Sequence, residues 1–115
     1  MNATVLSDFH SVVNMTADEI EAWLETAQSR SVGFTRPGET ESVGRQSGRA
    51  IVEILRRADD SPGDADLRHM KKVIGFVRRH RVQRPRRDVE RSRWRYSLMN
   101  WGHDPLKADL PFGQD

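Results

Sequence analysis

The sequence contains no cysteine among its 115 residues. This absence excludes disulfide bonds and thiolate metal sites, and it favours a reducing compartment. No apolar run approaches the roughly 18 residues that a membrane-spanning helix needs. The first ten residues, MNATVLSDFH, have neither the basic start nor the apolar stretch of a signal peptide. We therefore expect a cytoplasmic protein that does not enter a membrane.

Apolar residues are also scarce. They make up 36% of the chain, and charged residues make up 31%. Globular chains usually reach about 45–50% apolar content when glycine is included. A chain of this length and composition supports one domain with a thin core. We expect a single helical domain over residues 1–107, followed by a loosely held C-terminal tail over residues 108–115.

Motifs for catalysis or metal binding are missing as well. The four histidines share no metal-ligand spacing, and no serine or lysine stands in a recognisable nucleophile motif. The adjacent pair His103-Asp104 could serve acid–base chemistry, but neighbouring residues in a turn are a weak signal. We expect no enzymatic activity, no metal and no cofactor.

The segment GRQSGR, residues 44–49, precedes an apolar run. Glycine and serine before a helix can bind a phosphate through free backbone N–H groups. The spacing matches neither the P-loop nor the dinucleotide fingerprint. Tight packing at a helix entry is the favoured interpretation, and anion binding stays open.

Charge is unevenly distributed along the chain. Residues 1–66 carry 12 acids and 6 bases, a formal charge of −6, whereas residues 67–115 carry 13 bases and 5 acids, a charge of +8. Twelve of these bases lie between Arg68 and Arg95, where the only acids are Asp88 and Glu90. Two of the three tryptophans and the single tyrosine lie in or just after this stretch. Dense cations beside aromatics are typical of surfaces that bind polyanions, and a solvated charged face is the alternative.

The apolar residues follow the helical period of about 3.6 residues, and no segment alternates as a strand does. We predict an all-α, single-domain bundle of four or five helices with a long irregular loop near residues 29–44. The predicted helices are a short one from Ser7 to about Asn14, one over 16–28 that starts at the capping box Thr16–Glu19, one over 46–57, one that starts at Ser61 or Asp64 and ends before Pro85, and one from Asp88 or Ser92 to about Asn100. The predicted core comprises Trp23, Leu24, Ile51, Leu55, Met70, Ile74, Val77, Trp94 and Leu98.

Four segments carry a resemblance: NMTADEIEAWL, ESVGRQSGR, HMKKVIGFVRRH and WRYSLMNWGHDPLK. With them the chain resembles, from about Phe9 to Lys107, a family of small bacterial and fungal proteins classed as a domain of unknown function. Members of that family are often labelled as DNA-binding proteins. The resemblance implies nucleic-acid binding and assigns no functional residue. The Arg-rich segment QRPRRDVERSR departs from the pattern, because we expect relatives to be more acidic there.

The expected function is nucleic-acid binding through a basic helical surface, mainly by phosphate contacts, with DNA or RNA as the partner. Arg87, Arg91 and Arg95 recur at helical spacing and would form one stripe if this segment is helical throughout. The alternative is a protein-interaction module whose basic face meets an acidic partner, or the acidic half of a second copy in a homo-oligomer. The predicted nucleic-acid contacts are Arg68, Lys71, Lys72, Arg78, Arg79, Arg86, Arg87, Arg91 and Arg95.

Overall fold

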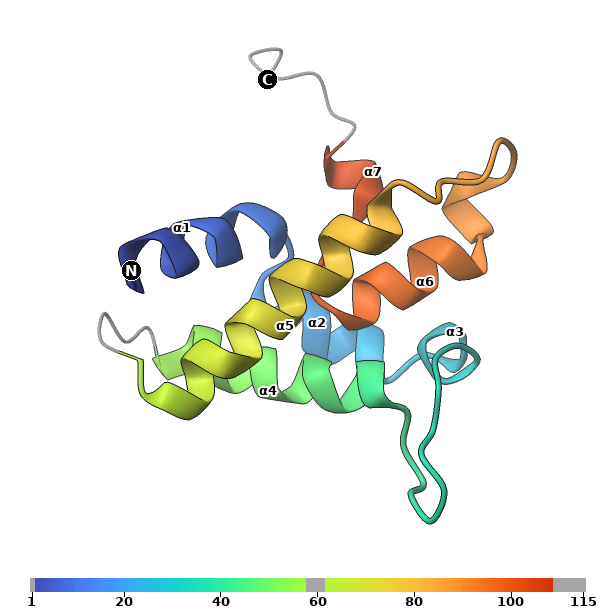
Figure 1. Cartoon of the computed structure of the whole chain (residues 1–115). Coiled ribbons are helices and arrows are strands. Elements are labelled where there is room, and N and C mark those ends of the chain that lie inside the picture. The colour runs from blue at the N-terminus through green and yellow to red at the C-terminus, as the bar shows by residue number, and fades with distance from the viewer. Residues whose placement is uncertain (1, 58–61, 109–115) are drawn as a thin grey trace.

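The computed structural model of the chain describes residues 2–57 and 62–108 (Figure 1). Every regular element in these residues is helical, which confirms the all-α prediction. The predicted four or five helices correspond to five helices of eight residues or more, and α3 and α7 are additional single turns of four residues. The elements are α1 (Asn2–Val12), α2 (Ala17–Leu24), α3 (Ala27–Arg30), α4 (Val43–Arg57), α5 (Asp64–Arg81), the 3-10 helix η1 (Val89–Arg91), α6 (Arg93–Asn100) and α7 (Pro105–Ala108).

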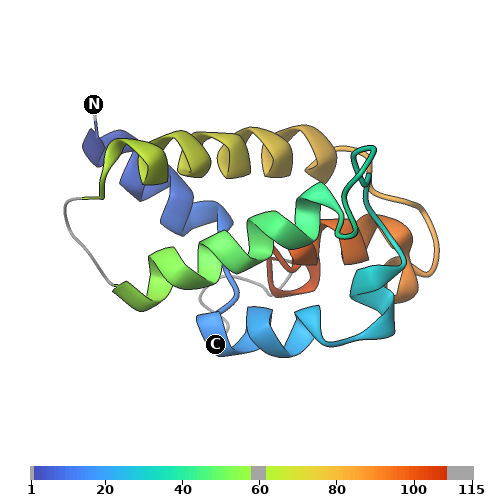
Figure 2. The same cartoon turned by 90° about the horizontal axis from the view of Figure 1, so that it is seen from below.

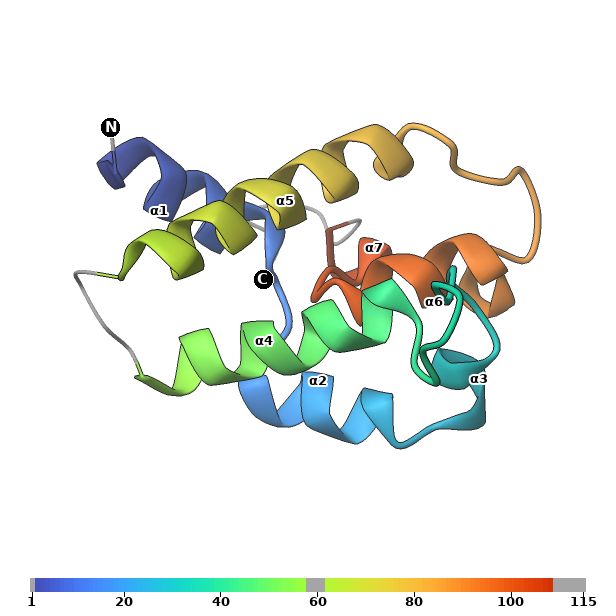
Figure 3. The ribbon, with the colours of Figure 1, turned by 60° about the horizontal axis from the view of Figure 1, so that its bottom comes forward.

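Helix α4 lies in the middle of the molecule. Helices α1 and α5 pack side by side on one side of α4, and α2 packs along its other side (Figures 2 and 3). Helix α6 lies near the N-terminal end of α4, where the long loop also runs (Figure 3). The molecule is flattened, with extents of 46 × 40 × 24 Å.

The capping box at the start of α2 is confirmed. The Thr16 hydroxyl accepts from Glu19 N, and Thr16 N donates to the Glu19 carboxylate. The predicted helix over 16–28 is interrupted at Glu25 and Thr26, because α2 ends at Leu24 and α3 begins at Ala27. Thr26 donates its hydroxyl to Trp23 O and accepts from Ser29 N, so it closes one helix and caps the next. A threonine that bonds nearby backbone in this way competes with helix continuation.

The segment GRQSGR lies inside α4, which begins three residues earlier than predicted. The Ser42 hydroxyl accepts from Arg45 N, and Ser42 O accepts from Gln46 N. Gly44, Ser47 and Gly48 are buried. Two N–H groups of the first turn of α4 are therefore already bonded, and the close contacts of Gly44 and Gly48 support the interpretation of tight packing.

Three further predicted helix starts can be compared with the structure. Ser7 lies within α1 and is not its cap. Asp64 is the first residue of α5, after Gly63, which makes no side-chain cap bond; Ser61 lies outside the described residues. Ser92 caps α6 by accepting from Arg95 N. Gly102 follows the C-terminal end of α6 with a φ of 79°, the left-handed conformation that glycine favours.

Most of the predicted core is buried. Leu24, Ile51, Met70, Ile74, Val77 and Leu98 belong to one cluster of buried residues. Trp23, Leu55 and Trp94 are only partly buried at its edge. The indole N–H of Trp94 donates to His80 O, so this ring keeps its polar end at the rim. Phe9, Val12 and Val13 join the core because α1 packs along α5.

Helices α4 and α6 approach closely at Gly48. A Cβ atom on Gly48 would lie 2.7 Å from Asn100 O, a backbone atom, and 3.2 Å from a methyl group of Leu24. Both neighbours are held by the fold, so they have little room to move. The absence of a side chain at Gly48 therefore allows α6 to pack this closely against α4.

We predict opposite effects for alanine at two helical glycines. Gly48→Ala should lower the free energy of unfolding by about 1–3 kcal/mol, the usual effect of overpacking a core. Gly75→Ala should leave it unchanged or raise it by up to about 1 kcal/mol, since alanine is the better helix former. At Gly75 the new Cβ would meet only the flexible end of Arg79. Urea unfolding of both variants tests this, and equal stabilisation by both would contradict the proposed close approach.

Candidate functional site

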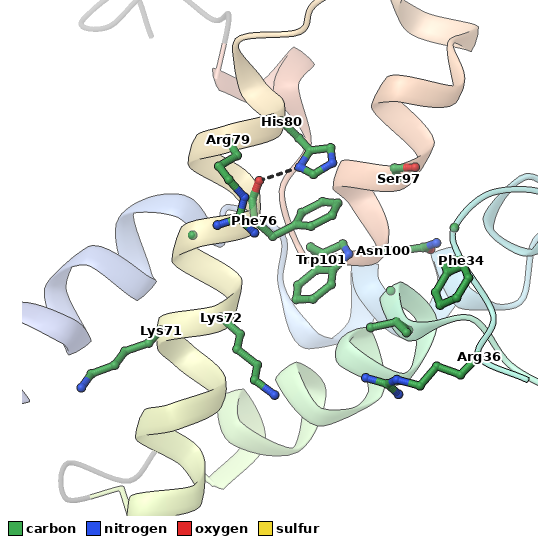
Figure 4. Close-up of a pocket in the computed structure, with 14 residues that line it drawn as sticks. Phe34, Arg36, Lys71, Lys72, Phe76, Arg79, His80, Ser97, Asn100 and Trp101 are labelled. Carbon is green, nitrogen blue, oxygen red and sulfur yellow. Dashed lines mark hydrogen bonds between the residues drawn. The ribbon is translucent and has the colours of Figure 1, made fainter. Parts of the chain in front are cut away.

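A cleft of about 630 Å³ opens between α5, the long loop, the start of α4 and α6. Four cations line it: Lys71, Lys72 and Arg79 come from α5, and Arg36 comes from the loop. None of its lining residues is acidic. Figure 4 shows Lys72 and Arg36 extending from opposite sides of the cleft, below Trp101. The cleft is therefore a cationic site with an aromatic floor.

The cations of α5 are exposed because the other side of this helix is used for packing, and of them Lys72 extends toward Arg36 in Figure 4. Met70, Val73 and Val77 are buried in the core, which leaves Lys71, Lys72 and Arg79 exposed. Gly75 also lines the cleft and has no side chain to fill it. The Arg79 guanidinium lies beside Gly75, where an added Cβ would be 3.0 Å from Nη1.

The floor of the cleft is a stack of rings. Phe76 lies parallel to His80 on one side, with ring centroids 3.8 Å apart, and to Trp101 on the other, at 4.3 Å. His69 continues the stack beyond Trp101 at 6.4 Å. Both faces of Phe76 are therefore covered, and Trp101 is only 8% exposed. Phe76 and Trp101 therefore form an apolar floor, and neither ring has an exposed face on which another ring could stack.

Phe34 is the contrasting aromatic residue of the cleft. Phe34 lies in the loop that forms one side of the cleft, and 68% of the residue is exposed. The backbone beside it is fixed, because Val43 N donates to Phe34 O at 2.8 Å and Gly33 adopts a φ of 99°. An exposed ring on an anchored backbone is a surface that a second aromatic group can cover.

Three polar groups in the cleft have unused hydrogen-bonding capacity. Neither Trp101 Nε1 nor Ser97 Oγ makes a hydrogen bond to any residue that the structure describes. His80 Nδ1 donates to Phe76 O at 3.1 Å, because a carbonyl can only accept, and Nε2 has no partner among the described residues. The cleft can thus both donate to and accept from a bound molecule.

The structure divides the predicted contact residues into groups. Arg68, Lys71, Lys72 and Arg79 are exposed on α5, and none of them forms an ion pair within residues 2–57 and 62–108. Arg86 and Arg87 are exposed in the connector before η1, and Arg91 is exposed at the end of η1. Arg36 is not among the predicted residues, because the loop shows no periodicity that would mark one of its side chains.

Arg78 and Arg95 are engaged within the chain. Arg78 forms an ion pair of 3.4 Å with Asp8 of α1. Arg95 donates to both carboxylate oxygens of Asp104 at 3.1 Å and also to Glu90 O. These contacts leave both side chains with less freedom to meet a ligand than those of Lys71 or Lys72.

The predicted stripe of Arg87, Arg91 and Arg95 is wrong. Asp88 adopts a left-handed conformation with a φ of 50°, and η1 ends at Arg91 before α6 begins at Arg93. The three arginines therefore belong to three separate backbone segments. The left-handed backbone of Asp88 and the local bonding of Ser92 to Val89 O interrupt the helix that the spacing requires.

His103 and Asp104 lie outside the cleft and serve the fold. His103 Nδ1 donates to Val12 O at 2.7 Å, and its Nε2 is buried without a hydrogen-bond partner in the described part of the chain. Asp104 accepts from Arg95 and from Leu106 N. Burial is the main cause that lowers the pKa of His103; the hydrogen bond to Val12 O opposes it in part, and the smaller effects of the Arg81 cation and the Asp104 carboxylate act in opposite directions.

We predict that His103 makes stability depend on pH. Its folded pKa lies below the ordinary 6.5, so the unfolded chain binds the proton more readily. Stability should therefore fall as the pH drops below about 6.5, by at most about 1.4 kcal/mol per pH unit for one proton.

His103→Asn removes this titration and can still donate to Val12 O, so its unfolding free energy should vary less between pH 7 and pH 5. His69, whose pKa burial also lowers, should retain part of the slope. His10→Asn, at an exposed position of α1, is the matched control. Superimposable pH profiles for wild type and His103→Asn would rule out the assignment.

Neither a cluster of three potential metal ligands nor a helix long and apolar enough to cross a membrane occurs in the described parts of the chain. Comparison with curated proteins and with solved structures gives no match. Residues 8–99 match the family described as "protein of unknown function (DUF3140)", a match that covers most of the chain. The chain belongs to this family of uncharacterised proteins.

Proposed function

We propose that this protein binds nucleic acid through the exposed face of α5 and the cleft beside it. The observation that supports this most directly is the set of cations around the cleft. Lys71, Lys72 and Arg79 share it with Arg36, and no carboxylate lines it. DNA is the expected form, because relatives in the family that the sequence resembles are often labelled DNA-binding. The proposed role is binding and not catalysis.

The spacing of the cations suits a phosphate backbone. From Arg68 to Arg79 the helix rises by about 16 Å, at 1.5 Å per residue. A DNA strand carries one phosphate per about 3.4 Å along the axis, so this face of α5 spans about five phosphates. Lysine meets each phosphate as a point charge, and arginine can also donate two parallel hydrogen bonds.

Weak sequence preference follows from the composition of this face. Its exposed side chains between Arg68 and Arg79 are all Lys or Arg. Asparagine and glutamine, which read adenine through paired hydrogen bonds, are absent from this part of α5. Contacts of this kind fix the position of a duplex and carry little information about its bases.

We predict a steep salt dependence. If about five phosphates are neutralised, the slope of log affinity against log salt should be near −4.5. Replacing Lys71, Lys72 and Arg79 together by Gln should bring it to about −2, because about two contacts remain. Fluorescence anisotropy of a labelled duplex across salt concentrations measures both slopes.

The matched control replaces Arg30, Arg56 and Arg57 by Gln. It removes the same charge from residues outside the cleft, and their ion pairs lie at the surface, where such pairs contribute little. A control that lowers the slope as much as the α5 variant does would show that net charge alone decides binding. Absence of binding to any duplex or single strand at about 50 mM salt would overturn the proposed function.

An acidic protein partner is the second candidate, since the same cations would attract it. Pairing between the acidic and basic halves of two copies has less support. Glu41 is held by Arg45 and Arg49, and Arg56 bridges Asp18 and Glu21. These acids are already engaged within their own chain.

A further inference from the structure

We propose that the cleft receives one unpaired nucleobase of a DNA strand, stacked on Phe34, while Lys72 and Arg36 contact the adjoining phosphates. This inference rests on the proposed function and makes it more specific. It implies that the protein prefers DNA containing unpaired bases to a perfect duplex.

Phe34 supplies the stacking face. The ring stack of His80, Phe76 and Trp101 covers its own faces, whereas Phe34 is 68% exposed at the opposite side of the cleft. The neighbouring Pro37-Gly38 turn is closed by a bond from Glu39 N to Arg36 O, so the loop that carries Phe34 contains a defined turn. Bases stack on aromatic side chains without strong sequence preference, because every base has a π-face.

The floor of the cleft supplies groups for the edge of a base. Trp101 Nε1 has no acceptor among the described residues, and a Cβ on Gly44 would lie 3.0 Å from it. Glycine at position 44 therefore lets the backbone of α4 lie close to this N–H, where a Cβ atom would crowd it. Ser97 Oγ and His80 Nε2 add a hydroxyl and an acceptor in the same cleft. Every base presents ring nitrogens or carbonyl oxygens that such groups can bind.

Charge complementarity points to a nucleotide and not to an apolar peptide. Four cations line the cleft beside its aromatic floor, and no carboxylate lines it. Arg36 lies 3.5 Å from Glu39, but both side chains are exposed, and a pair of this kind is weak and screened. The volume of about 630 Å³ lies within the range of small-molecule sites.

A base reaches this cleft only when it leaves its own stack. In a perfect duplex each base is paired and covered on both faces, so extrusion opposes binding. A mismatched or unpaired base has already lost much of that stabilisation. Selectivity for unpaired DNA therefore follows from the concave shape of the site.

The test compares three DNAs of equal length and phosphate number: a perfect duplex, the same duplex with a central mismatched bubble, and a bubble whose unpaired nucleotides are abasic. We expect wild-type protein to bind the mismatched bubble at least about fivefold more tightly than the other two, since base–aromatic stacking contributes about five- to 150-fold per base. Equal phosphate numbers hold the electrostatic contribution nearly constant.

Variants at position 34 identify the stacking ring. Phe34→Ala should remove the preference for the bubble and leave perfect-duplex affinity within about twofold, and Phe34→Trp should restore the preference. Val82→Ala is the matched control, because Val82 is 81% exposed and does not line the cleft. It should behave as wild type. Phe34 is largely exposed, so these replacements should leave the fold intact.

Each outcome has one meaning. Binding of all three DNAs with equal affinity, unaffected by Phe34→Ala, would overturn this inference and leave the proposed function standing. A preference for both bubbles over the duplex would show that flexibility is recognised, which also contradicts base stacking. If dAMP at an equal nucleotide concentration displaced the bubble DNA, the cleft would be a pocket for free nucleotides. That result would contradict recognition of a base within a DNA strand. Failure of every DNA to bind would remove the proposed function itself.

Discussion

The hydrogen bonds of Asn100 hold the helices of this protein in their positions. Asn100 is 1% exposed, and its Oδ1 accepts from Trp23 Nε1 of α2 and from Ser29 Oγ of α3. Arg45 of α4 donates to the same Ser29 hydroxyl and to Leu24 O. A buried polar group that loses its partner destabilises a fold by about 1–3 kcal/mol, so each member of this network fixes the others. Because the apolar core is thin, the specificity of packing depends on these few polar contacts. It also depends on Gly48 of α4, which allows Asn100 O to approach closely.

The same arrangement builds the cleft. Asn100 is followed by Trp101, so fixing Asn100 against α3 and α4 also places the indole that forms the floor. Gly44 and Gly48 lie one turn apart on α4: Gly48 meets Asn100 O, and Gly44 meets Trp101 Nε1. Ser29 and Arg45 anchor the two ends of the loop that carries Phe34 and Arg36. The contacts that hold the core together therefore also shape the cleft.

Sequence patterns predicted the features that depend on local chemistry. The capping box at Thr16, the apolar residues of α5 and the end of that helix before Pro85 all follow from residues within a few positions of one another. Features that depend on partners distant in sequence were not predictable. The spacing of Arg87, Arg91 and Arg95 suggested a stripe, but it contained no information about Asp104, which binds Arg95. Arg36 and Phe34 lie in an aperiodic loop, and only the fold brings them opposite α5.

The fold also explains how a chain of net charge +2 can present a cationic site. Acids of the first half are paired in place: Glu41 with Arg45 and Arg49, Glu19 with Lys107, and Glu21 with Arg56. These contacts lower the pKa of Glu41, of Glu19 and of Glu21, chiefly through hydrogen bonds from Arg49, Lys107 and Arg56. Few acids remain to neutralise the exposed face of α5: Asp8 pairs with Arg78, whereas Arg68, Lys71, Lys72 and Arg79 form no ion pair with the described residues. Such a face is stabilised most by an anion with several regularly spaced charges, and a phosphate backbone has that form.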